Sequence, residues 1–179
     1  TGGGVFKSID KGETWVQLEE TAGNENFRFV NRLTIHPVDS NIVLAATTSG
    51  IYKTIDGGTT WNEVYASLTS VEDIKADTSD FNYIYAGVNS LGIIRSTDAG
   101  DTWEVSSNGI IGGNGRFEIA ISPSNPNRIF TSVENSERGS DVYVSSNKAN
   151  TWNLVKNSYG EAIDYLGGQA SYDNAIAAH

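Results

Sequence analysis

The sequence predicts an all-β fold, a β-propeller of four-stranded antiparallel blades, and three observations lead to it. A turn motif that ends in Trp occurs four times, and its Trp residues are 46, 42 and 49 residues apart, close to the length of one blade. Short apolar or alternating runs lie between the motifs, as β-strands require. The 19 Gly residues and the many Ser, Thr, Asn and Asp residues suit frequent tight turns.

The recurring motif, which we call the box, is expected to be a tight hairpin turn. A Ser or Thr hydroxyl and the Asp two residues later can accept hydrogen bonds from the N–H groups of the turn. The Gly at the fifth position supplies positive φ, Thr starts the return strand, and Trp buries its ring. We interpret the box Asp residues as structural. The signature residues are Ser8, Asp10, Gly12, Thr14, Trp15, Thr54, Asp56, Gly58, Thr60, Trp61, Ser96, Asp98, Gly100, Thr102, Trp103, Ser145, Asn147, Thr151 and Trp152.

The fourth box departs from the others at two positions. Asn147 replaces the Asp, and Ala149 replaces the Gly. Asn keeps a side-chain acceptor, but Ala has a Cβ that disfavours positive φ. We therefore expect Ala149 to be strained or this turn to be rearranged.

These boxes resemble the Asp-box of the bacterial neuraminidase repeat, and the chain is similar to Asp-box β-propellers of the sortilin-like and xyloglucanase-like types. The copies at 8–15, 54–61 and 96–103 match at every signature position. The resemblance implies a propeller. It does not choose a function, because the motif occurs in sialidases, xyloglucan-cleaving endoglucanases, sortilin-type receptors, a photosystem II assembly factor and many secreted bacterial proteins.

The repeats divide the chain into whole and partial blades of one domain, residues 1–179. With two partial blades at the ends and no initiator Met, we expect a partial propeller, about four blades of seven or more. The remainder of its own propeller is then an expected partner. The expected segments are a partial blade at 1–20, blades at about 27–66, 71–107 and 116–156, and the start of another at 171–179.

Composition excludes several classes of function. The net charge of −10 and the lack of a basic run argue against nucleic acid. Without Cys there is no disulfide or thiol chemistry. No membrane span is visible in this segment. His36 and His179 share one repeat position and lack metal-ligand spacing, so neither a metal nor a cofactor is expected.

Two glycosidase hypotheses can be tested against the residues. A sialidase needs an arginine triad and a Tyr paired with a Glu, whereas the six Arg residues are scattered over different repeat positions. One of them, Arg95, takes the position of Lys7 and Lys53, which indicates a repeated structural cation. The Arg residues are Arg28, Arg32, Arg95, Arg116, Arg128 and Arg138.

The xyloglucan-cleaving type needs two carboxylates facing each other across a cleft. The resemblance implies an Asp where this chain has Thr48-Ser49-Gly50, and neither Thr nor Ser can replace a carboxylate in proton transfer. Asp141, Glu134 and Glu137 carry carboxylates near the corresponding place in a later blade. No catalytic residue is assigned.

The favoured hypothesis is a non-catalytic binding or scaffold module of a secreted bacterial protein. Propellers present loops on a rigid disc, here to an unknown protein or glycan. Tyr159, Tyr165 and Tyr172 lie in a Gly-rich stretch and are candidates for a contact loop. The expected location is extracellular or at the cell surface, with the periplasm as the alternative. The alternative functions are a xyloglucan-cleaving endoglucanase and a photosystem II assembly-factor-like propeller, for which arginine-rich blades are expected.

Overall fold

The computed structural model describes residues 2–137, 139–166 and 174–179. Almost all regular structure in these ranges is β-strand, and the helical elements there are two short 3₁₀ turns, η1 (Glu19–Thr21) and η2 (Glu25–Phe27). The described residues form no apolar helix long enough to cross a membrane.

Strands that follow one another along the chain pair as antiparallel neighbours, which gives one two-stranded and three four-stranded sheets. We call them the first to fourth blades. This confirms the predicted fold class, a partial β-propeller of about four blades. The blades are β1 (Phe6–Lys7) and β2 (Val16–Gln17); β3 (Val30–Ile35), β4 (Val43–Thr47), β5 (Gly50–Thr54) and β6 (Asn62–Ala66); β7 (Val71–Ala76), β8 (Ile84–Val88), β9 (Gly92–Ser96) and β10 (Glu104–Val105); and β11 (Gly113–Ile121), β12 (Ile129–Asn135), β13 (Gly139–Ser145) and β14 (Asn153–Leu154).

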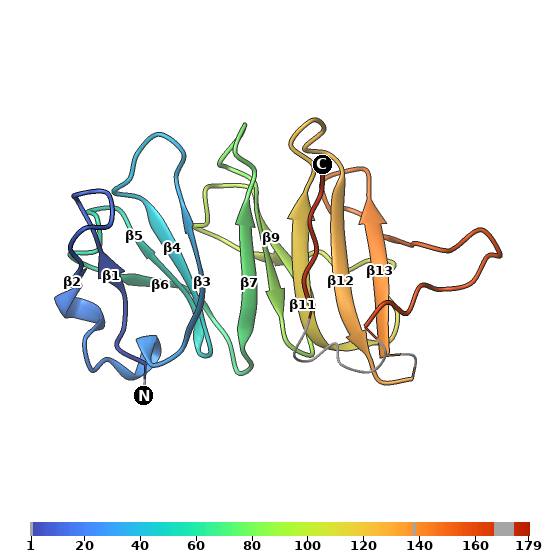
Figure 1. Cartoon of the computed structure of the whole chain (residues 1–179), viewed down its shortest axis with the longest axis horizontal. Helices are drawn as coiled ribbons and strands as arrows, with labels where there is room; N and C mark the ends of the chain where they lie inside the picture. Colours follow the sequence, from blue (N-terminus) through green and yellow to red (C-terminus); the bar gives the residue numbers. More distant parts are fainter. Residues whose placement is uncertain (1, 138, 167–173) are drawn as a thin grey trace.

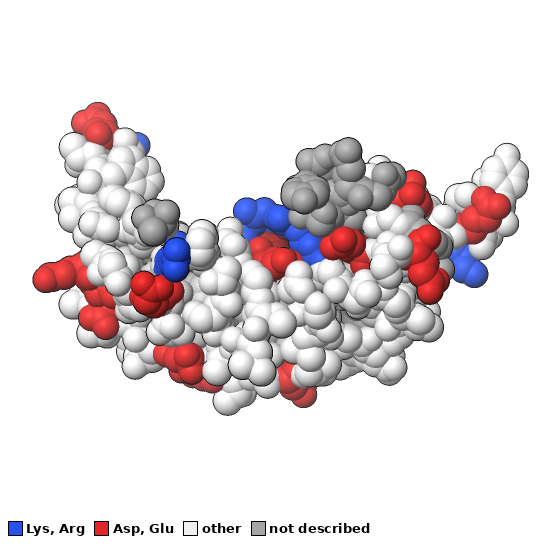
Figure 2. Space-filling model, turned by 90° about the horizontal axis from the view of Figure 1, so that it is seen from below, with Lys and Arg blue, Asp and Glu red and all other residues white. Residues whose placement is uncertain are grey.

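The blades stand side by side in chain order, from β1 and β2 at one end to β11–β14 at the other (Figure 1). The innermost strands of the four-stranded blades, β3, β7 and β11, contact one another in that order. The array curves, so that one face of the molecule is hollow (Figure 2). Residues 174–179 lie against the fourth blade, where Asn174 meets Ser132 of β12.

The core consists of apolar layers between the blades. Leu44, Ile51 and Ile74 belong to the layer between the second and third blades, and Phe117 and Tyr143 to the layer around the fourth blade. The middle strands β4 and β8 are covered on both faces, which is why their sequences read as short continuous apolar runs.

The inner strand of the second blade is less covered than its neighbours. Leu33, Ile74 and Ile119 occupy one repeat position, yet Leu33 is 43% exposed while Ile74 and Ile119 are 1% exposed. The first blade has two strands in the described residues, and so its β1–β2 hairpin leaves part of this side of β3 open.

Candidate functional site

The box turns have the hydrogen bonds that their residue types predict. Asp56 accepts from the backbone N–H of Thr60 at 2.9 Å and from its hydroxyl at 2.7 Å, and Thr54 Oγ1 accepts from Gly58 N at 2.9 Å. Hydrogen bonds from the Thr four residues on lower the pKa of Asp10 and of Asp56 to about 2. These carboxylates are therefore ionised and fully engaged in shaping the turn.

The fourth box keeps this geometry at the expense of strain. Asn147 Oδ1 accepts from Thr151 N at 3.0 Å, and Ala149 N donates to Ser145 Oγ at 3.0 Å. Ala149 has φ 63°, a left-handed conformation that costs a residue with a Cβ about 1–2 kcal/mol. We expected either strain at Ala149 or a rearranged turn. The structure has the strained Ala149 in a turn that is not rearranged.

Burial of the box Trp residues follows their place in the array. Trp152 is 3% exposed and donates to Ser106 O of the preceding blade at 2.7 Å. Trp61 is half-buried, with its ring 5.2 Å from that of Phe27. Trp15 is 62% exposed, so the expected burial is wrong there, because no blade precedes it among the described residues.

One cation per blade holds the box of the next blade. Lys7 Nζ donates to Gly57 O at 3.1 Å, Lys53 Nζ to Ala99 O at 2.8 Å, and an Arg95 guanidinium nitrogen to the carbonyl of residue 148 at 2.7 Å. The acceptor is always the carbonyl at the fourth box position. This is the repeated structural cation expected from the alignment of Arg95 with the two Lys residues.

A group of charged side chains, which we call the inner cluster, joins the innermost strands of three blades. Arg32 of β3 lies 3.6 Å from both Asp73 of β7 and Glu118 of β11. Lys75 Nζ lies 3.1 Å from Asp73, and an Arg116 nitrogen lies 2.7 Å from Glu118. Arg32, Asp73 and Glu118 occupy the same repeat position, so they lie next to one another on the innermost strands of three successive blades.

The two carboxylates of the cluster are buried and tied to the backbone or to arginine. Asp73 accepts from Ile74 N and, through its other oxygen, from Ile119 N, each at 2.9 Å. Burial raises the pKa of Glu118 and the Asp73 charge raises it further, while Arg116 and Arg32 oppose both effects. The carboxylates thus act first as anchors between blades.

The cations of the cluster form its solvent side. The Arg32, Lys75 and Arg116 side chains are 44%, 40% and 28% exposed, against 0% for Asp73 and 5% for Glu118. Figure 2 shows Lys and Arg atoms gathered in the middle of the hollow face, beside acidic atoms. A chain with net charge −10 therefore presents cations at this place.

A polar cavity of about 310 Å³ opens beside the cluster, between Val30, Asn31, Arg32, Ser70, Glu72 and Arg116. Asn31 Nδ2 donates to Ser70 Oγ and to Val71 O, each at 2.8 Å. Glu72 Oε1 accepts from Asn89 Nδ2 at 3.0 Å. Glu72 Oε2 is buried and has no hydrogen-bond partner among the described residues.

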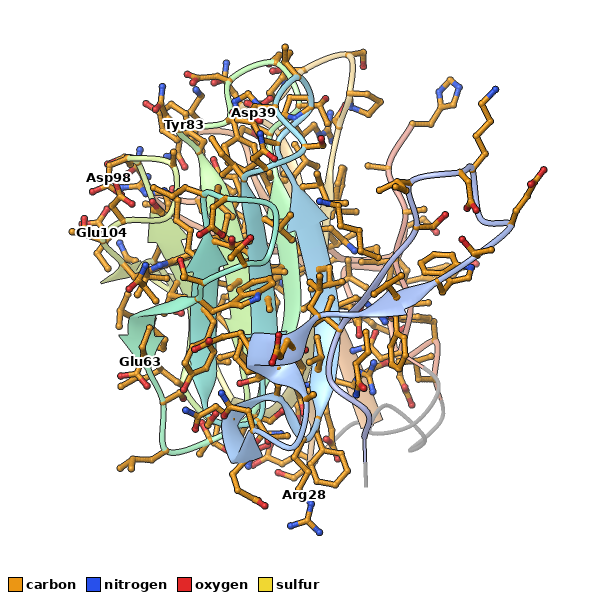
Figure 3. The ribbon with its side chains drawn as sticks, turned by 90° about the vertical axis from the view of Figure 1, so that its left-hand side faces the viewer. Arg28, Asp39, Glu63, Tyr83, Asp98 and Glu104 are labelled. Carbon is orange, nitrogen blue, oxygen red and sulfur yellow. The ribbon has the colours of Figure 1, made fainter. Side chains whose placement is uncertain are left out.

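The outer rim of the blades carries a different set of charges. Figure 3 shows Asp98 and Glu104 along one edge of the view, with Arg28 at the opposite end of the strands from Asp39 and Tyr83. Glu104 pairs with Arg95 at 2.5 Å, and Arg28 lies 3.6 Å from Glu25. Arg28 is outside the inner cluster.

Of the Tyr residues proposed as a contact loop, Tyr159 and Tyr165 lie in different surroundings. Tyr159 is exposed in a turn closed by Asn157. Tyr165 Oη donates to Asn174 Oδ1 at 3.0 Å, and burial raises the pKa of its phenol, with Glu118 adding to the rise. Tyr165 therefore lies near the inner cluster. Tyr172 lies outside the described residues.

Of the acidic residues considered for catalysis, one is buried, one is partly buried and one is exposed. Asp141 is buried in β13 and accepts from Asn135 Nδ2 at 2.6 Å. Glu134 accepts from Arg116 N at 3.4 Å, and Glu137 is exposed.

Neither His residue lies in a ligand cluster. His36 Nδ1 accepts from Val38 N and Asp39 N in a turn, and its ring packs on Phe81 with 4.5 Å between centroids. His179 is exposed. Within the described ranges, no three His, Cys, Asp or Glu side chains are placed to hold a metal ion.

The inner cluster was missed in the sequence, where the Arg residues seemed scattered. Arg32 and Arg116 do fall at different repeat positions, but Arg116 stands two residues before Glu118 on β11, and Arg32 reaches Glu118 from β3, so both guanidinium groups meet the same carboxylate. The available signal was the occurrence of Arg32, Asp73 and Glu118 at one inner-strand position.

Comparison with known proteins supports the fold. No family model matches the chain, and no curated protein matches it. An ancestral GH74 enzyme is similar in structure with a TM-score of 0.69 and 21% identity, over 87% of this chain and 22% of that one. YCF48 bound to D1 peptide gives a TM-score of 0.55 and 20% identity, over 83% of this chain and 46% of that one.

A GH74 enzyme of Niastella koreensis gives a TM-score of 0.50 and 22% identity, over 86% of this chain and 34% of that one. The chain thus spans less than half the length of each of these three proteins. At these identities the likeness establishes a β-propeller module.

Proposed function

We propose that this propeller is a non-catalytic binding module and that the hollow face around the inner cluster is its recognition surface. The observation that carries the proposal is the layering of charge: Arg32, Lys75 and Arg116 face solvent above carboxylates that are almost fully buried. Fixed carboxylates hold the cations in place, so a partner meets a preorganised surface. The partner is a protein or a glycan.

The bonding of the carboxylates favours binding over catalysis. A general acid or base must reach the proton that it transfers. Both oxygens of Asp73 accept backbone hydrogen bonds, and both oxygens of Glu118 face guanidinium groups. Neither carboxylate is arranged to transfer a proton to a substrate.

Hydrolysis of a xyloglucan-type glycan is the second candidate. The observation in its favour is the raised pKa of Glu118, because a general acid of a glycosidase needs a raised pKa. The similarity to GH74 enzymes is one of fold alone and does not extend to their chemistry.

A role like that of a photosystem II assembly factor is the third candidate. It is favoured by three cations on one face and by the fold likeness to YCF48, whose structure holds a D1 peptide. Binding of a peptide would make this candidate a special case of the binding module.

The wider assignment is also a proposal. We infer a secreted bacterial protein of the Asp-box, or bacterial neuraminidase repeat, group, located outside the cell or at its surface, with the remainder of its own propeller as an intramolecular partner. The hydrogen-bonded geometry of the boxes supports the group. The exposed inner strand β3 supports a contact with further propeller strands.

Two assays of the purified chain test the proposed function. Incubation with xyloglucan oligosaccharides should release no reducing ends, and a panel of immobilised glycans and peptides should give saturable binding. Reducing ends released by the chain, and lost in Glu118→Gln, would overturn the proposal in favour of hydrolysis. Binding that is unchanged after Arg32→Ala and Arg116→Ala would remove the hollow face as the recognition surface.

A further inference from the structure

We propose that the polar cavity beside the inner cluster is a subsite for a carboxylated sugar, a hexuronate residue of an acidic glycan. This inference rests on the proposed binding function and names its ligand class. The ligand's carboxylate lies against Arg32 and Arg116, and one of its hydroxyl groups donates to Glu72.

The two arginines supply the anion-binding half of the subsite. Among the described residues, Arg32 donates one hydrogen bond, at 3.3 Å to Asn31 O, and its two carboxylate neighbours lie at 3.6 Å, beyond hydrogen-bond distance. Arg116 uses Nε and one terminal nitrogen on Glu118. Both arginines line the cavity and keep N–H groups that bond to no described residue, and guanidinium groups bind carboxylates in a planar, two-bond geometry.

Glu72 supplies the other half. Its Oε2 atom is buried and has no donor among the described residues, a state that is costly for a charged oxygen. A simple anion would be repelled by Glu72. A ligand that carries a carboxylate and a hydroxyl group satisfies the arginines and Glu72 together, because a turn of the Glu72 carboxylate toward the cavity that it lines lets the hydroxyl donate to Oε2.

The size and lining of the cavity suit one sugar ring. Its volume of about 310 Å³ lies at the small end of ligand pockets. Val30 is the one apolar side chain in the lining, whereas the centre of a protein interface is largely apolar. The lining therefore favours a polyhydroxylated acid over an apolar peptide side chain.

The experiment is calorimetric titration of the full chain with a galacturonate trisaccharide, and with its methyl ester as the uncharged control. We expect the ester to bind about tenfold or more weakly, because it lacks the charge that strengthens the guanidinium hydrogen bonds. Arg32→Ala and Arg116→Ala should each weaken binding of the acid about tenfold. Arg28→Ala, outside the inner cluster, should change it less than about twofold.

Glu72→Ala separates this subsite from a simple anion site. We expect it to weaken binding of the galacturonate but to strengthen binding of sulfate, since it removes both an acceptor and a negative charge. Circular dichroism and thermal unfolding establish that each variant is folded, and Glu72→Gln, which retains an oxygen acceptor, should recover part of the galacturonate affinity.

Several outcomes would overturn the subsite. One is equal affinity for the galacturonate and its methyl ester, and another is tighter galacturonate binding by Glu72→Ala. Equal loss of galacturonate affinity in Arg28→Ala and Arg32→Ala would also overturn it. So would an acidic peptide that competes for the cavity with the same affinity as the galacturonate. Binding of a different glycan or peptide that is unaffected by Arg32→Ala would also overturn it, while leaving a binding module in place. Xyloglucan hydrolysis, in contrast, would overturn the proposed function itself.

Discussion

At the scale of single residues, the box Asp side chains couple stability to pH. Hydrogen bonds lower the pKa of Asp56 to about 2, whereas the pKa of an unfolded Asp is about 3.9. Its stabilising effect is therefore complete above about pH 4 and is lost as the pH falls toward 2. We expect Asp56→Asn, which copies the natural Asn147, to lower stability at pH 7 and to have a much smaller effect near pH 2.5. Urea unfolding at both pH values measures this, and equal losses would contradict it.

The box Trp residues offer a matched pair. Trp152→Ala should destabilise the chain by about 3–5 kcal/mol, because a large buried ring is removed and a cavity remains. Trp15→Ala should change stability by about 0.5 kcal/mol or less, as is usual for an exposed side chain. Denaturant unfolding of both variants is the measurement, and similar losses would show that Trp15 is covered in solution.

The fifth box position has positive φ, which favours Gly, yet the fourth box has Ala there. At Gly100, φ is +86° and an added Cβ would lie 2.4 Å from Leu44 Cδ2. Gly100→Ala should therefore destabilise by about 1–3 kcal/mol through overpacking, measurable by thermal unfolding. At the same position, Ala149 is fully buried and packs in the core of the fourth blade, so burial of its methyl group offsets part of the strain. An unchanged melting temperature in Gly100→Ala would show that Leu44 moves aside easily.

At the scale of elements, the cation on the third strand of one blade fixes the box of the next. Lys53 is almost buried and binds Ala99 O and Asp101 Oδ1 at 2.8 and 2.6 Å. Lys53→Met retains the aliphatic stem but leaves the Ala99 carbonyl without this donor, which should lower stability by about 1–3 kcal/mol.

Hydrogen exchange provides the decisive measurement for that variant. Amide protection should fall in the box at 96–103 and remain in the box at 54–61, which Lys7 holds. Lys11→Met, at an exposed position, is the control and should leave both boxes unchanged. A uniform loss of protection in Lys53→Met would contradict a local role.

Local sequence specified the elements better than the site. The Asp10, Asp56 and Asp98 turns depend on contacts within four residues, so residue type and spacing predicted them. The Arg32–Glu118 contact joins β3 to β11, two strands that each pack against β7 of the third blade. Such a contact depends on the curvature of the array and on side-chain reach, which repeat spacing does not specify. Glu72 had no sequence signal, because its significance comes from the burial of one oxygen atom.

At the scale of the whole molecule, burial increases from the open edge inward. Leu33 and Ile74 share a repeat position but are 43% and 1% exposed. Ile74→Ala should destabilise by about 2–5 kcal/mol, whereas Leu33→Ala should have a much smaller effect. Comparable losses, measured by denaturant unfolding, would mean that the side of β3 is covered.

The cation contacts between blades have a direction. The donors Lys7, Lys53 and Arg95 always precede their acceptors, the carbonyls of residues 57, 99 and 148. A ribosome releases the amino end first, so each cation leaves the exit tunnel before the turn that it will hold. Every newly made hairpin can thus dock on a blade that already exists, and the array can assemble in step with translation, without waiting for its last strand.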